Sequence, residues 1–289
     1  MKSKTLKLLY VVNPGSGKGE INYTTEITAF FKKREEHIEI YELPSNCSLE
    51  KLKAAIKKSN ADRIIAVGGD GTLKMVAECV VNTEMPLGII PAGSANGMAK
   101  ELGIPLELQD AIELTTAGKL EKIHAVMVNK ELCIHLSDIG FNAYLVKKFD
   151  DLPTRGMKTY AKAAWHAFWN HRKMDVSFKV DGKIIKQKAA MVAIANATKY
   201  GTGLEINPDG KLDDRLFEVI IVKEYAVMEI IKIWISKLPW NPKKIESYQL
   251  SELEIKTKHK VHFQVDGEYL GKVDRVVAKI MPKALTVIV

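Results

Sequence analysis

The sequence predicts a two-part chain: an α/β N-terminal domain with a doubly wound, mostly parallel sheet, followed by a β-rich C-terminal domain built as an antiparallel sandwich. Three observations predict this fold class. Apolar strands alternate with helical stretches over the first 120 residues or so, strict polar–apolar alternation takes over after about residue 122, and glycine-rich loops come after three of the early strands. With 289 residues, of which 46% are hydrophobic, the chain is long enough to bury two cores.

The N-terminal elements alternate in a β-α order. Strands are predicted at 6–12, 38–43, 63–67 and 86–91, and helices at about 21–35, 49–59, 73–82 and 97–104. Ser48 and Thr72 have the side chains of helix N-caps. Because parallel strands end at the same edge of a sheet, the glycine-rich loops at 13–19, 68–71 and 92–97 are expected to converge on one crevice.

The C-terminal part has the two-residue period of antiparallel strands. In residues 174–187 the apolar side chains Val176, Phe178 and Val180 alternate with polar ones and precede an Asp-Gly turn, and residues 261–271 repeat the pattern. Two helical stretches, 157–172 and 225–238, interrupt these strands. We therefore expect domains at 1–122 and 123–289, with the option that the last strand returns to the first domain.

The charge and cysteine content restrict the partners and the compartment. Lysine and arginine exceed the acids by 43 to 35, a formal charge of +8 that favours an anionic partner. The basic residues are dispersed and no zinc-finger or RNP-like motif accompanies them, so we expect no nucleic acid and keep an anionic membrane surface. No apolar run approaches the ~18 residues that cross a bilayer. Three cysteines without a CxxC pair indicate a reducing, cytoplasmic compartment.

The glycine-rich loops point to phosphate binding, but one of them carries an acid. Residues 15–19 fit neither the Walker A spacing nor the complete Rossmann pattern, and any one loop is equally typical of a tight turn. Three such loops at one sheet edge favour a nucleotide. Asp70, in the Gly-Gly-Asp-Gly loop, is compatible with phosphate if a divalent cation lies between them. The alternative is ordinary turn chemistry, as at Asp181-Gly182.

Four segments together resemble the diacylglycerol kinase catalytic superfamily, which includes bacterial lipid kinases, sphingosine kinases and ceramide kinases. They are VVNPGSGKG, VGGDGTL, PLGIIPAGSANGMAKELGIP and NPDGKLDDRLFEVIIV, and they cover nearly the whole chain in order. The resemblance implies an NAD kinase or phosphofructokinase-like N-terminal fold. It also implies ATP- and Mg²⁺-dependent phosphorylation of a lipid hydroxyl, that of diacylglycerol or a related lipid, by a protein associated peripherally with the membrane. The lipid is expected between the domains or at the β-rich one.

The resemblance also implies roles for individual residues. Asp214 is similar to the acid of a structural magnesium site, completed by main-chain oxygens of Lys211 and Leu216, and Glu268 matches the catalytic base. The residues expected to contact the nucleotide and its phosphates are Asn13, Gly15, Ser16, Gly17, Ser45, Gly68, Gly69, Asp70, Gly71, Thr72, Ser94 and Asn96.

The chain departs from the family pattern at four positions. Lys74 and Met75 replace an Asn-Glu pair after the signature loop, Gly97 stands where many bacterial members have an aspartate, and His124 stands near the aspartate that pairs with the catalytic base. A histidine there would alter the pKa of Glu268 or have no catalytic task. Two alternatives therefore stay open: a soluble GGDG-type kinase acting on a nucleotide-like substrate, and a nucleotide- or lipid-binding regulator that has lost catalysis.

The two helical stretches of the C-terminal part carry aromatic and basic residues together. Trp165, Phe168 and Trp169 accompany lysines in the first, and Trp234 with Trp240 does so around the second. This composition fits helices that lie on a membrane surface, and it fits equally helices with one buried and one solvated face. The sequence does not decide between these two interpretations of the helices, and it does not identify the lipid or the oligomeric state.

Overall fold

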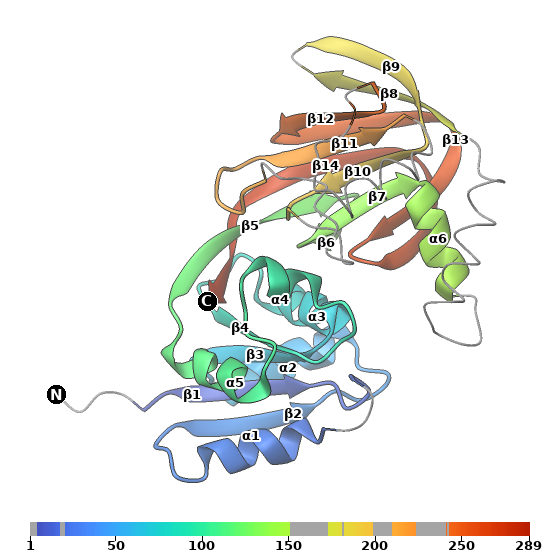
Figure 1. Cartoon of the computed structure of the whole chain (residues 1–289). Coiled ribbons are helices and arrows are strands. Elements are labelled where there is room, and N and C mark those ends of the chain that lie inside the picture. Colours follow the sequence, from blue (N-terminus) through green and yellow to red (C-terminus); the bar gives the residue numbers. More distant parts are fainter. Residues whose placement is uncertain are drawn as a thin grey trace. The chain divides into compact units, whose positions relative to one another are not determined.

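The computed structural model describes residues 5–17, 21–150, 173–180, 182–198, 210–223, 241 and 243–289, with the backbone alone for 149 and 150. The chain forms two compact units. Unit 1 comprises Met1–His124 with Pro282–Val289, and unit 2 comprises Ala125–Met281. Figure 1 gives the element labels used below. The helices predicted at 157–172 and 225–238 lie outside the described residues.

Unit 1 is built on a parallel sheet in the strand order β2-β1-β3-β4. The end of β14 continues this sheet, because Thr286 and Val287 pair with β4 in parallel register. Apart from the exposed edge strand β2, these strands are almost entirely buried, as expected for a sheet covered on both faces. The strands are β1 (Lys7–Val12), β2 (His37–Glu42), β3 (Arg63–Gly68), β4 (Pro86–Pro91) and β14 (Glu268–Ile288).

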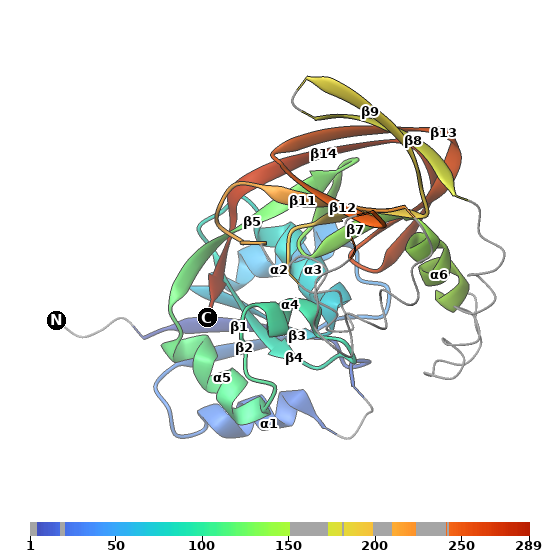
Figure 2. The same cartoon turned by 45° about the horizontal axis from the view of Figure 1, so that its top comes forward.

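Helices cover both faces of this sheet, which confirms the doubly wound prediction. Buried side chains of α1 and α5 pack with Leu8, Tyr10 and Val12 on one face, and α3 packs against β3 and β4 with α2 beside it (Figures 1 and 2). The helices of unit 1 are α1 (Tyr23–Phe31), α2 (Leu49–Ser59), α3 (Asp70–Val80), α4 (Gly97–Glu101) and α5 (Leu108–Ala117). No helix in the described part of the chain is long and apolar enough to span a bilayer.

The helix starts agree with the sequence at one predicted cap and differ at the other. Ser48 caps α2, since its side chain accepts the Lys51 N–H. Thr72, the other predicted cap, lies inside the first turn of α3, and Gly69 is the N-cap. The helix begins at Asp70, before the predicted start, because Gly69 adopts the extended conformation of an N-cap. Asp70 is thereby in the first turn, where the helix dipole stabilises a negative charge.

Unit 2 is an antiparallel sheet in the order β12-β11-β10-β7-β13-β14, with the hairpin β8-β9 beside β13 and with β6 paired to β5. Helix α6 (Phe141–Asp150) packs on β7 and β13. The remaining strands are β5 (Leu120–Val128), β6 (Glu131–Cys133), β7 (Leu136–Gly140), β8 (Met174–Val180), β9 (Lys183–Ala189), β10 (Met191–Ala195), β11 (Phe217–Val222), β12 (Ile245–Leu250) and β13 (Glu252–Val265).

The core of unit 2 confirms the predicted inward faces. Val176, Phe178, Phe263 and Val265 are buried in it, and Val261 packs against them. The sequence patterns did not predict α5, the strands from β5 to β7, or α6. Of these elements, β6 has only three residues, and β7 is buried along its whole length, so the alternation that marks a half-buried strand is absent there.

Candidate functional site

The predicted nucleotide loops of unit 1 lie side by side at the carboxyl edge of its sheet. Val12 is in register with Val67, and Gly68 with Pro91, so β1, β3 and β4 end at the same level. Main-chain bonds extend this pairing into the loops, where the Asn13 N–H donates to Val67 O at 3.0 Å and the Ala92 N–H to Gly68 O at 2.9 Å. The loops therefore converge at one edge of the sheet, as the sequence predicted.

Glycine is required where two of the loops meet. A Cβ atom on Gly93 would lie 2.6 Å from the Cα of Gly69, a separation that real Cβ atoms do not adopt. In the first loop, Gly17 has a positive φ of 78°, which side chains disfavour. The loops after β3 and β4 can therefore approach each other this closely only with glycine at position 93.

Asp70 joins the second loop to the third. Its carboxylate accepts the N–H groups of Gly97 at 3.1 Å and of Met98 at 3.3 Å. These donors belong to the first turn of α4, whose N–H groups need partners outside the helix. Because a carboxylate offers about four acceptor positions, two hydrogen bonds leave capacity for a cation. Asp70 thus has a structural contact that the sequence did not predict, and its donor chemistry still fits Mg²⁺.

Two asparagines fix the other loops. The Asn13 Nδ2 donates to the Thr72 hydroxyl at 3.0 Å, and the Asn13 Oδ1 accepts the Gly15 N–H, so this side chain ties the first loop to α3. Asn96, in a left-handed conformation with φ 51°, bonds both the N–H and the carbonyl of Gly93 at 2.8 Å. Both contacts arrange the main chain of a loop, which is the part that a phosphate-binding loop uses.

The exposed residues of the predicted site are all glycines or serines. Ser45 lies in the loop after β2, beside the end of β1, because Leu43 N donates to Val12 O at 2.8 Å. Gly71 has open space around its Cα. The exposed predicted residues are Gly15, Gly17, Ser45, Ser94 and Gly71, and Ser16 is half-buried.

Three of the four departures from the family pattern, Lys74, Gly97 and His124, are buried in unit 1. His124 is 0% exposed, and its Nδ1 accepts the Lys283 N–H at 3.3 Å. Lys74 is 3% exposed inside α3, beside the half-buried Met75. The contact of His124 is with the main chain of the last strand. A catalytic role for His124 toward Glu268 stays a prediction.

Glu268 lies at a tight turn of unit 2. It is the exposed first residue of β14, paired across the hairpin with Val265, and the two residues between them have positive φ values of 49° and 86°. Two positive φ values in a two-residue loop are typical of a type I′ turn with Asp-Gly at its centre. The turn thus presents the Glu268 carboxylate at the end of a strand, as predicted.

Asp266, expected from the sequence only as a turn residue, anchors this hairpin. Its carboxylate accepts the N–H groups of Ile134, His135 and Leu136, each at 2.9 Å. In return, the Asp266 N–H donates to Leu136 O at 2.8 Å. Burial of the carboxyl group raises the pKa of Asp266, and the three backbone donors act against that rise. The turn is therefore bound to the segment between β6 and β7.

A second polar contact holds the same turn from inside the core. Gln264 is 2% exposed; its Oε1 accepts the Gly267 N–H at 2.8 Å, and its Nε2 donates to the carboxylate of Asp138. Asp138, 1% exposed on β7, also accepts from Asn142 of α6 at 2.6 Å. Strand alternation alone gives no signal for this arrangement, because a glutamine between Phe263 and Val265 is expected to face outward.

Asp214 lies in the loop before β11, where its Oδ1 accepts the Leu216 N–H at 3.0 Å. Arg215, between them, has a positive φ of 66°. Within the described ranges no group of three or more His, Cys, Asp or Glu side chains is placed to hold a metal ion. The predicted site instead uses one carboxylate with the carbonyl oxygens of Lys211 and Leu216, and oxygen donors of this kind are the ones that Mg²⁺ takes.

Comparison with known proteins identifies the family of both parts. Residues 7–128 match the family model described as the diacylglycerol kinase catalytic domain, and residues 137–289 match the YegS C-terminal NAD kinase beta sandwich-like domain. These matches confirm the predicted α/β domain followed by a β sandwich.

Individual relatives agree with the family models. A Klebsiella pneumoniae protein described as a probable lipid kinase YegS-like is 30% identical over 78% of this chain and 77% of its own length. The diacylglycerol kinase of Bacillus subtilis is 26% identical over 73% of this chain and 72% of its own length. A solved diacylglycerol kinase structure from Bacillus anthracis has the same fold, with a TM-score of 0.77 at 21% identity over 99% of this chain and 98% of that one. The chain therefore belongs to the family of lipid kinases that includes the diacylglycerol kinases and the YegS-like proteins.

Proposed function

We propose that the chain is an ATP- and Mg²⁺-dependent kinase that phosphorylates a lipid hydroxyl, that of diacylglycerol or a closely related lipid. One observation carries this proposal: the three glycine-containing loops of unit 1 are joined at one sheet edge, with Asp70 bonded to the loop after β4. Phosphoryl transfer depends chiefly on positioning and on neutralising phosphate charge. Other main-chain N–H groups of the loops that Asn13 and Asn96 arrange would position the phosphates, and bound Mg²⁺ would neutralise part of their charge.

Glu268 is the proposed general base. In the transfer, the lipid hydroxyl oxygen bonds to the γ-phosphorus, the bond from that phosphorus to the ADP oxygen breaks, and the hydroxyl proton moves to the Glu268 carboxylate. The type I′ turn exposes Glu268, and the bonds of Asp266 and Gln264 hold the main chain of this turn. A turn that is already ordered loses little main-chain freedom when substrate binds.

The proposal is tested by replacing the base. Glu268→Gln should lower turnover by about 10²-fold or more and leave ATP affinity nearly unchanged, because the carboxylate acts chiefly in the transition state. The measurement is phosphate transfer from labelled ATP, with magnesium, to diacylglycerol, phosphatidylglycerol, sphingoid and undecaprenol-type lipids in mixed micelles. Glu252→Gln, at the exposed first residue of β13, is the matched control and should retain activity.

Four results would contradict this assignment in different ways. Undiminished turnover of Glu268→Gln would show that Glu268 is not the general base. Loss of ATP binding by this variant would make Glu268 a nucleotide-facing or structural residue. ATP binding by the wild-type chain without transfer to any lipid would favour the regulator, the alternative that Met75 and His124 suggest. Transfer that needs no micelle and uses a soluble acceptor would favour the GGDG-type kinase.

A further inference from the structure

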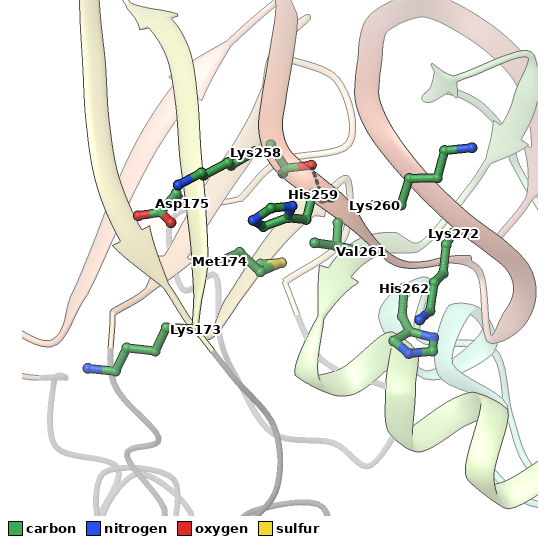
Figure 3. A pocket seen from close by; sticks show the side chains of 10 residues that line it. Lys173, Met174, Asp175, Lys258, His259, Lys260, Val261, His262 and Lys272 are labelled. Carbon is green, nitrogen blue, oxygen red and sulfur yellow. Dashed lines mark hydrogen bonds between the residues drawn. The ribbon is translucent and has the colours of Figure 1, made fainter.

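A basic pocket in unit 2 lies where β13 passes from one partner strand to another (Figure 3). It has a volume of about 350 Å³ and is lined by residues of β8, β13 and β14 with Lys173. The charged and imidazole side chains of the lining are those of Lys173, Asp175, Lys258, His259, Lys260, His262 and Lys272.

A bulge in β13 builds this pocket. The strand pairs with β8 up to Thr257 and with β14 again from Val261, and its register with β14 shifts between Lys256 and Val261. Between these points the Thr257 hydroxyl donates to His259 O at 2.8 Å, which closes the bulge on itself. Lys258, His259 and Lys260 are exposed as a result. Bulges redirect side chains in this way at functional sites.

The pocket concentrates positive charge. Its lining has four lysines and two histidines against a single acid, Asp175. That acid is directly opposite Lys188 in the β8-β9 pairing, so a lysine outside the lining already faces it. Within the described part of the chain, Lys258, Lys260 and Lys272 have no ion-pair partner. Such a group of cations favours an anionic ligand.

An aromatic and basic wall extends the pocket. The Nδ1 of His262 lies 2.8 Å from the Tyr269 hydroxyl, and its ring centroid is 5.1 Å from that of Tyr144 on α6. The ammonium groups of Lys147 and Lys148 lie over the rings of Tyr269 and Tyr144 at 6.0 and 5.7 Å. Tyrosines beside lysines are typical of surfaces that meet lipid headgroups, where one end of the ring is apolar and the other hydrated.

We infer that this pocket binds a phosphate group, carried by the headgroup of an anionic phospholipid. Lysine ammonium groups from β13 and β14 would surround the phosphate, while the tyrosines contact the region beneath it. The site itself requires no catalysis, and only the choice of a lipid as the carrier rests on the proposed lipid kinase function. The ligand would hold unit 2 at a membrane surface without being phosphorylated.

Vesicle binding without ATP tests this inference. The variant Lys258→Gln, Lys260→Gln, Lys272→Gln should bind phosphatidylcholine–phosphatidylglycerol vesicles on the order of 10²-fold more weakly than wild type, since each lysine near an anionic surface contributes about fivefold. A matched variant removes three exposed lysines from the neighbouring hairpin: Lys179→Gln, Lys183→Gln, Lys186→Gln. This hairpin variant should lose far less affinity for the vesicles than the pocket variant. Arginine at the three pocket positions should retain binding.

A second arm identifies the carrier of the phosphate. Inorganic phosphate is titrated against chloride at equal ionic strength, and thermal stabilisation is measured for the wild type and both triple variants. If the pocket variant loses the stabilisation by phosphate but binds vesicles like the wild type, the pocket is a phosphate site whose ligand is soluble. Equal losses in the two triple variants, or no binding by the wild type in either arm, would overturn the inference. Phosphate transfer in mixed micelles is scored separately, so a failure here is distinguishable from a failure of the proposed kinase activity.

Discussion

Two Asp-Gly pairs, 70–71 in unit 1 and 266–267 in unit 2, use the same side chain differently. Asp70 starts a helix and accepts two N–H groups at 3.1 and 3.3 Å, whereas Asp266 has a left-handed conformation and accepts three at 2.9 Å. The Asp266 carboxylate is therefore largely occupied by the main chain. Asp70 retains acceptor capacity, and glycine leaves open space beside it. An acid in a glycine turn is thus an anchor in one place and a candidate ion ligand in the other.

The largest effect should come from removing the anchor. Asp266→Ala leaves three N–H groups without their acceptor and puts alanine at a positive φ, so the free energy of unfolding should fall by about 4 kcal/mol and the melting temperature by about 10 °C. Differential scanning calorimetry measures this. The exposed Asp274→Ala in the same hairpin is the control, and equal melting temperatures for the two variants would show that Asp266 is not an anchor.

Asp70→Asn should separate activity from stability. An amide oxygen still accepts one of the two N–H groups, so melting should change by no more than about 3 °C, while turnover falls by about 10²-fold because the charge that would bind the cation is lost. Steady-state kinetics at saturating magnesium measures the second effect. Asp110→Asn, in the first turn of α5, is the matched control. Near-wild-type turnover of Asp70→Asn would make Asp70 a second anchor.

Asp214 adds a third case, in which the carboxylate accepts the N–H of Leu216. If it holds a structural cation, Asp214→Ala should abolish the rise in melting temperature that magnesium gives the wild type, a rise of a few degrees at about 100 times the dissociation constant. Melting curves with magnesium and with a chelator measure it, and the exposed neighbour Asp213→Ala should respond like wild type. An equal magnesium response in Asp214→Ala would contradict the metal site.

Features that depend on period and topology were the most predictable from the sequence. The parallel strands, the convergence of the loops after β1, β3 and β4, and the hairpin before Glu268 all depend on patterns a few residues long. The contacts that give the site its geometry do not. No local rule pairs Asp70 with Gly97 or Asp266 with Ile134, because each bond joins segments brought together only by the complete sheet.

The burial of polar residues in the core could not be predicted from the sequence either. Gln264 alternates with Phe263 and Val265 in sequence, yet all three are buried, since the glutamine amide bonds Asp138 and Gly267. Periodicity assigns a polar residue at that position to solvent. His124, expected either to affect Glu268 or to have no catalytic task, is buried within β5 and accepts the main-chain N–H of Lys283.

The course of β14 constrains the order in which the protein can be completed during synthesis. Its final residues pair with β4, so the sheet of unit 1 lacks this strand until all of unit 2 has been translated. At roughly 5–20 residues per second, that delay is on the order of ten seconds. Until then Pro86 and Leu87 lack this partner strand, and their main-chain groups can pair with a foreign strand. We therefore expect the nascent chain to be open to wrong strand pairing at this edge while unit 2 is being made.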